Sequence, residues 1–80
     1  MTPRSLRFIV ADVLQVSIAE INEESGMNLT TNWDSLNHFV IVTTLERELG
    51  ARVVFDEMEA LSTVKEIRSF LVSQGIELDD

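Results

Sequence analysis

Three residues close together in the sequence carry the side-chain types of a hydrolytic triad. Asp34 and Ser35 lie four and three residues before His38, the one histidine of the chain. A serine, a histidine and a carboxylate can together activate a hydroxyl as a nucleophile. On a helix, however, these spacings set the side chains beside one another on one exposed face, with no cleft and no oxyanion donors. We therefore expect His38 to be a solvated surface residue, and a hydrolytic site is the least favoured interpretation.

A second group of polar residues, Asp56, Glu57 and Glu59, has side chains that metals bind. It lacks the glycine and the ligand spacing of a calcium loop, so we interpret it as a charged helical turn and predict no metal site. The chain also has no cysteine, which excludes disulfides, thiolate metal sites and a cysteine nucleophile. Any thiol chemistry must come from a group added to the protein.

Size and charge narrow the classes of function. The 80 residues predict a single small domain over 1–80 that is too small to enclose a deep active site, so we do not expect an enzyme. Six basic against 14 acidic residues give a net charge of −8. This charge disfavours nucleic acids and anionic membranes and favours a protein partner with a basic patch. With neither a signal peptide nor a membrane-spanning run, we expect a cytoplasmic monomer.

The elements that must position these residues are predicted to be helices. Thr2 and Pro3 are suited to open a first helix over residues 3–15. Residues 16–33 are rich in turn-forming side chains and predict a long, ordered loop. Four apolar side chains are expected to attach this loop to the core: Ile18, Ile21, Met27 and Leu29.

The clearest predicted element is a second helix. Asp34 is suited to cap it, and Gly50 is suited to end it in a left-handed conformation. Residues 51–55 predict an extended connection. Because the Val53-Val54-Phe55 run has no second run with which to pair, we predict no sheet.

Residues 56–61 predict one acidic helical turn. Thr63 and Glu66 then have the spacing of a capping box for a last helix that ends near Gly75, and residues 76–80 form an acidic tail that is expected to fray. The predicted fold is all-α, a small four-helix bundle with three long helices and one short helix. Its predicted core comprises Leu6, Ile9, Val13, Leu36, Phe39, Val42, Leu45, Leu49, Val53, Val64, Ile67 and Leu71.

The tripeptide Asp34-Ser35-Leu36 at the head of the second helix is an ordinary helix start by itself, but its context makes it specific. The run Asn32-Trp33-Asp34-Ser35-Leu36, followed by Leu45 to Gly50 and by Leu61 to Val64, resembles the acyl carrier proteins. The resemblance covers essentially the whole chain, with the serine roughly midway along an acidic sequence of the length of a free-standing carrier.

This resemblance implies that a phosphopantetheinyl transferase attaches 4′-phosphopantetheine from coenzyme A to Ser35. By the same analogy, Asp34 belongs to the surface that the transferase reads, and Leu36 anchors the helix start in the core. The physical reading agrees, because a phosphodiester at a helix N-terminus lies near unpaired amides and the positive end of the dipole. The arm also supplies the thiol that the chain lacks.

The resemblance further implies that acidic residues present the carrier to basic patches on acyl-loading and acyl-processing enzymes. Asn37 and Val40 stand where many family members carry acids, which indicates a dedicated set of partner enzymes. The predicted partner-binding residues are Val40, Glu46, Glu48, Asp56, Glu57, Met58 and Glu59. For Val40 and Met58, the sequence is equally consistent with two exposed apolar side chains that have no partner.

The cargo stays open among fatty-acid-like, polyketide and other specialised pathways. Trp33 before the tripeptide, together with Glu20-Ile21-Asn22 in the loop, resembles carriers of specialised pathways. For Trp33 itself we favour the interpretation that the indole covers the underside of the loop. A peptidyl or aminoacyl carrier is one alternative, against which the absence of a glycine pair before Asp34 argues. An acidic helical interaction module without a prosthetic group is the other.

Overall fold

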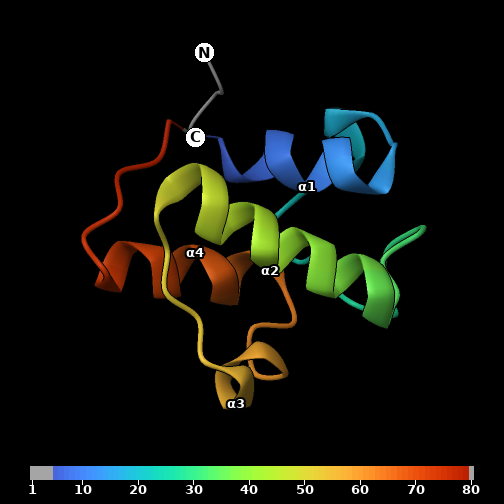
Figure 1. Cartoon of the computed structure of the whole chain (residues 1–80). Helices are drawn as coiled ribbons and strands as arrows, with labels where there is room; N and C mark the ends of the chain where they lie inside the picture. Colours follow the sequence, from blue (N-terminus) through green and yellow to red (C-terminus); the bar gives the residue numbers. More distant parts are fainter. Residues whose placement is uncertain (1–4, 80) are drawn as a thin grey trace.

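The computed structural model describes residues 5–79. Figure 1 shows α1, α2 and α4 forming the body of the molecule, with α3 below them. No strand occurs among these residues, so the prediction of an all-α fold with three long helices and one short helix is confirmed. The elements in chain order are α1 (Leu6–Leu14), the 3-10 helix η1 (Ile18–Glu20), α2 (Ser35–Leu49), α3 (Phe55–Met58) and α4 (Val64–Ser73).

Helix α1 begins later than the sequence suggests. Ser5 is its N-cap, and the Ser5 hydroxyl accepts a hydrogen bond from the Phe8 amide at 3.1 Å. Because Ser5 has extended backbone angles, α1 begins at Leu6, a few residues after the predicted start at about residue 3. The proposed roles of Thr2 and Pro3 lie outside the described residues.

Helix α2 has the predicted limits, because both of its ends are set by local chemistry. The Asp34 carboxylate accepts from the Asn37 amide at 2.8 Å. Gly50 has a φ of 73°, and its amide donates to the Glu46 carbonyl at 3.1 Å. Glycine adopts this left-handed conformation without the steric cost that other residues incur.

Helix α4 has the predicted N-cap, but Glu66 acts differently from the carboxylate of a reciprocal capping box. The Thr63 hydroxyl accepts from the Glu66 amide at 3.2 Å, as predicted. The Glu66 carboxylate accepts from the hydroxyls of Thr63 and Ser62, each at 3.0 Å. These hydrogen bonds, that of Thr63 first, hold the pKa of Glu66 below its ordinary value.

The core lies where α1 packs against α2 and α4, and most of its predicted members are buried. Val13 and Val53 are partly buried against it. Leu36 and Phe39 are exposed by 71% and 51%, so their assignment to the core is wrong. Five apolar side chains that the prediction omitted are fully buried: Val10, Leu14, Ile21, Trp33 and Ile41.

The long segment between α1 and α2 is tied to α4. Gly26 and Thr63 form an isolated antiparallel bridge, and the Met27 amide donates to the Ser62 carbonyl at 2.9 Å. A Cβ on Gly26 would lie 2.7 Å from that carbonyl oxygen, so the close approach requires glycine. The expected attachment through buried Ile21 and partly buried Met27 is confirmed.

The same segment differs from its prediction in two details. Ile18 and Leu29 are exposed by 43% and 77%, so their predicted attachment to the core is wrong. The sequence reading also missed η1, in which Ser17 and Glu20 form a reciprocal capping box. Hydrogen bonding within the segment thus replaces some of the apolar contacts that we expected.

The acidic tail lies against the body instead of fraying over its described length. Ile76 and Leu78 pack on the core, and the Ile76 amide donates to the Leu71 carbonyl at 3.1 Å. In Figure 1 this segment runs from the end of α4 toward the beginning of α1. No helix of the part of the chain described here has the length and apolar character needed to cross a membrane.

Candidate functional site

Ser35 is the first residue of α2, and its side chain is exposed. Asp34 satisfies two amides of the first turn, those of Asn37 through its carboxylate and His38 through its carbonyl, both at 2.8 Å. The amides of Ser35 and Leu36 have no acceptor among the described residues. The helix start beside the Ser35 hydroxyl therefore offers unpaired donors and the positive end of the helix dipole to an anion.

His38 is buried, with 3% of its surface exposed, so the expectation of a solvated histidine is wrong. Its Nδ1 lies 2.9 Å from the Trp33 indole nitrogen, and its Nε2 lies 2.9 Å from the Met58 carbonyl oxygen. Because both ring nitrogens are engaged, His38 cannot act as a base toward Ser35 in this geometry. The residue types of a triad are present without the arrangement of one.

Trp33 supplies the environment that allows this histidine to be buried. It is 1% exposed, and its ring stacks on the imidazole with the centroids 6.0 Å apart and 28° between the planes. The interpretation of the indole as cover for the underside of the loop therefore fits the structure, and its N–H has an acceptor as buried indoles usually do. No local sequence pattern pairs Trp33 with His38.

Exposed apolar side chains follow Ser35 on α2, next to the two acidic residues Asp34 and Glu59. Leu36, Phe39 and Val40 lie at spacings of three and four on α2 and are all exposed. Val54 and Phe55, at the start of α3, are exposed by 60% and 83%. This density of exposed apolar side chains is a feature of interaction sites.

A pocket of about 180 Å³ opens beside Ser35. It brings together three segments: the loop before α2, the first turns of α2, and α3. Its lining is mostly apolar, with Glu59 as the one acidic member, and consists of Met27, Ser35, His38, Phe55, Met58 and Glu59. Of the residues predicted to bind partners, Met58 and Glu59 are thus beside the serine.

The other predicted acids differ in how freely they could meet a partner. Glu46 accepts from the Val53 amide at 3.3 Å, Glu57 accepts from the Val54 amide at 3.2 Å, and Glu48 pairs with Arg47 at 3.4 Å. The carboxylates of Glu46 and Glu57 therefore support the connection between α2 and α3 as well as contributing charge, whereas Glu48 pairs within α2. Asp56 is exposed.

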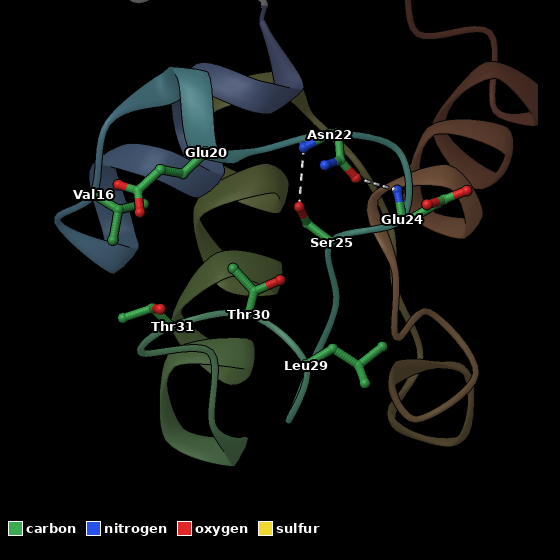
Figure 2. Close-up of a pocket in the computed structure, with 8 residues that line it drawn as sticks. All are labelled: Val16, Glu20, Asn22, Glu24, Ser25, Leu29, Thr30 and Thr31. Atoms are coloured by element: carbon green, nitrogen blue, oxygen red, sulfur yellow. Dashed lines mark hydrogen bonds between the residues drawn. The ribbon is translucent and has the colours of Figure 1, made fainter.

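A larger pocket, of about 350 Å³, lies between η1 and the 22–31 segment and does not include Ser35. Figure 2 shows its polar rim. The backbone amide of Asn22 donates to the Ser25 hydroxyl at 2.9 Å, and the backbone amide of Glu24 donates to the side-chain oxygen of Asn22 at 2.8 Å. The described residues contain no group of three metal-binding side chains. Of the two pockets, only the smaller one adjoins the serine.

Sequence comparison with known proteins shows the family of the chain. No family model matches the chain. It is 32% identical over 66 residues to an acyl carrier protein of Thermosynechococcus vestitus, covering 82% of each chain. It is 30% identical over 69 residues to the polyketide-8 synthase acyl carrier protein 2 of Streptomyces avermitilis, covering 86% of this chain and 79% of that one. The chain belongs to the acyl carrier protein family.

Proposed function

We propose that this protein is a discrete acyl carrier that holds its cargo as a thioester on 4′-phosphopantetheine attached to Ser35. The observation that carries the proposal is the position of Ser35: an exposed serine at the first residue of a 15-residue helix, in a chain of this family. The protein would be the substrate of a phosphopantetheinyl transferase and afterwards a shuttle between enzymes, with no catalysis of its own. The engagement of both His38 nitrogens supports the last point.

The residues at the site fit such a group. The Ser35 and Leu36 amides are oriented by the helix and can receive the negative charge of a phosphodiester. The Asp34 carboxylate binds the Asn37 amide and leaves the Ser35 and Leu36 amides available. When bound, the group supplies a thiol that can form a thioester, which the cysteine-free chain cannot supply itself.

The surface near Ser35 supports a division of labour in partner binding. Leu36 and Val40 would contact the transferase and the acyl-processing enzymes directly, with Met58 at the pocket. Acids farther along the chain would attract basic patches on these enzymes at longer range, with Asp56 and Glu59 the most available. The stretch from Leu36 to Leu45 contains no acidic residue, so direct contact beside the serine is mainly apolar.

The pathway is proposed only as a class. The relative from Streptomyces avermitilis is named for a polyketide synthase, which supports a polyketide or another specialised pathway alongside a fatty-acid-like one. An aminoacyl cargo would use the same attachment. The choice among these cargoes belongs to the partner enzymes.

The proposal is tested by incubating the purified chain with coenzyme A, magnesium and a broad-specificity phosphopantetheinyl transferase, and then measuring the intact mass. We expect the mass of one phosphopantetheine to be added to the wild type and to Ser69→Ala, which removes another exposed serine, on α4. Ser35→Ala should remain unmodified. An unmodified wild type would overturn the proposal in favour of an acidic interaction module, and a modified Ser35→Ala would overturn the site.

A further inference from the structure

The start of α2, where Ser35 lies, has no buried side chain to hold it. Asp34, Ser35 and Leu36 are all exposed, and Leu36, the expected anchor of the helix start, is exposed by 71%. The nearest buried residues are Trp33 before this stretch and His38 after it. Helix ends open with free energies near zero unless other contacts hold them. Contacts other than apolar packing must therefore order the turn that carries the serine.

Two asparagine side chains connect this turn to the segment before it and to α1. The Nδ2 of Asn32 donates to the carbonyl of Leu14, the last residue of α1, at 2.9 Å. The Nδ2 of Asn37 donates to the backbone carbonyl of Asn32 at 2.7 Å. Because both acceptors are carbonyl oxygens, each side-chain amide must present its nitrogen. The two hydrogen bonds form a connection from the end of α1 to the first turn of α2, here called the amide bridge.

The amide bridge has one member on each side of Ser35 in the sequence. Asn32 lies three residues before the serine, and Asn37 lies two residues after it. The Asn32 carbonyl also accepts from the Asp34 backbone amide at 3.1 Å, so one oxygen receives a donor from each side of the serine. The Asp34 carboxylate caps the first turn locally, whereas the amide bridge fixes that turn relative to another helix.

A second asparagine in the same segment shows that the side chain of Asn32 does more than its backbone requires. Asn28 and Asn32 both have a φ of 66°, a left-handed conformation that asparagine tolerates better than most residues. The Asn28 side chain is exposed and forms no hydrogen bond within residues 5–79, whereas that of Asn32 reaches α1. The backbone accounts for asparagine at both positions, but only Asn32 contacts a second helix.

The amide bridge also gives a structural reason for Asn37, which stands where many family members carry an acid. A carboxylate at this position would have no N–H for the Asn32 carbonyl and would place a negative charge against that oxygen. Contact within the chain therefore explains the amide at position 37 without reference to the partner enzyme.

We propose that Asn32 and Asn37 are positioning residues that hold the first turn of α2 in the conformation that a phosphopantetheinyl transferase binds before it modifies Ser35. This inference rests on the proposed function, because it concerns the modification of the serine. Without the amide bridge, the turn is ordered for a smaller fraction of the time. The apparent affinity of an enzyme that binds only the ordered turn falls with that fraction. Loss of the amide bridge should therefore raise KM and leave kcat nearly unchanged.

The role of Asn32 is tested by transferase kinetics on Asn32→Asp and on the matched control Asn28→Asp, with coenzyme A and magnesium. Both substitutions add one negative charge to the same segment and keep a residue that tolerates a left-handed backbone, but only Asn32→Asp removes a donor to α1. We expect the KM of Asn32→Asp to exceed that of Asn28→Asp by about three- to tenfold, with kcat within about twofold. Equal KM values, or a loss confined to kcat, would overturn the role of Asn32.

The role of Asn37 is tested by Asn37→Ala, which removes the other half of the amide bridge. Its KM should rise above the wild-type value, although alanine itself favours a helix. The control is Thr63→Ala, which removes the N-cap hydrogen bond of α4 and destabilises the chain without changing α2. A merely structural role would give both variants the same KM, and this result would overturn the role of Asn37.

The amide bridge itself can be observed in the unmodified wild-type chain, without a variant and without the transferase. We expect 15N relaxation to show the side-chain amides of Asn32 and Asn37 as ordered on the picosecond-to-nanosecond timescale and that of Asn28 as mobile. An Asn32 or Asn37 amide as mobile as that of Asn28 would overturn the amide bridge, and this measurement decides if a variant fails to fold. A wild type that the transferase leaves unmodified would instead overturn the proposed function, so the two failures are distinguishable.

Discussion

The two faces of α2 have similar apolar side chains and opposite environments. One face buries Ile41, Leu45 and Leu49 in the core, and Val42 on the same helix is also buried. The other exposes Leu36, Phe39 and Val40 beside Ser35. Hydrophobic residues on the first face hold the fold together, whereas those on the second contribute little to it and are available for contact with another protein. Apolar composition alone does not distinguish the two roles.

The same substitution on each face should separate stability from recognition most strongly. Leu45→Ala removes a side chain that is 2% exposed and should lower the free energy of unfolding by about 2–5 kcal/mol. Leu36→Ala removes one that is 71% exposed and should change it by less than about 0.5 kcal/mol. Urea unfolding measures both, and equal losses of stability would show that the exposed face is part of the core.

Leu36→Ala should instead affect the encounter with the transferase. If the exposed face of α2 is a contact surface, the kcat/KM for modification of Ser35 should fall by about five- to tenfold, as for loss of a contact worth about 1 kcal/mol. The matched control is Val72→Ala, which truncates an apolar residue exposed by 59% on α4. If both substitutions left the kcat/KM unchanged, the exposed face of α2 would not be a contact surface for the transferase.

His38 is the one polar member of the buried face. His38→Ala leaves the Trp33 N–H and the Met58 carbonyl without their partner and should cost about 1–3 kcal/mol in the free energy of unfolding. Asn37 precedes His38 on α2 and is more exposed, and its side-chain amide donates to the Asn32 carbonyl. Asn37→Ala removes this hydrogen bond and should lower the free energy of unfolding by less than His38→Ala. Thermal unfolding checks the order, and a stable His38→Ala would contradict a buried, fully bonded imidazole.

The starts of α2 and α4 provide a smaller and more selective contrast. Asp34 and Thr63 each accept from the third amide of their helix, so alanine at either position should cost about 1 kcal/mol in the free energy of unfolding. Only Asp34→Ala should also slow the modification of Ser35, because only α2 carries the serine. Equal transferase kinetics in the two variants would leave Asp34 with its capping role alone.

The smallest expected effect concerns Glu66, which occupies the third position of α4, where α2 has Asn37. Because its pKa is lowered from 4.5 on folding, Glu66 contributes stability above that value and loses it as pH falls through the lower, folded pKa. Acidification should therefore reduce the Tm of the wild type slightly more than that of Glu66→Gln. A greater acid sensitivity of Glu66→Gln would reverse the sign and contradict the hydrogen bonding described here.

The limits of the helices were predictable where the signals are local. Asp34, Gly50 and Thr63 act through their own backbone or the next turn, and the sequence places each correctly. Ser17 and Glu20 have the spacing of a capping box and could have revealed η1. Ile76 and Leu78 likewise carried a signal, since alternating apolar residues in an acidic tail indicate packing on one side.

The environment of α2 could not be predicted in the same way, because apolar residues occupy more than one stripe of this helix. The choice between the stripes depends on which neighbours pack against the helix. Burial of His38 depends on a carbonyl 20 residues away, at Met58, which no local pattern reveals. The sequence therefore identifies the residues near Ser35. Only the structure shows which of their side chains are exposed and which are buried.

The most direct measurement is peptide mapping by mass spectrometry of the wild-type chain after reaction with coenzyme A and the transferase. The proposed function predicts that one phosphopantetheine is added and that fragmentation places it on Ser35, at the start of α2, with other serines such as Ser17 and Ser69 unmodified. The account would be contradicted by an unmodified chain, or by a modified residue other than Ser35.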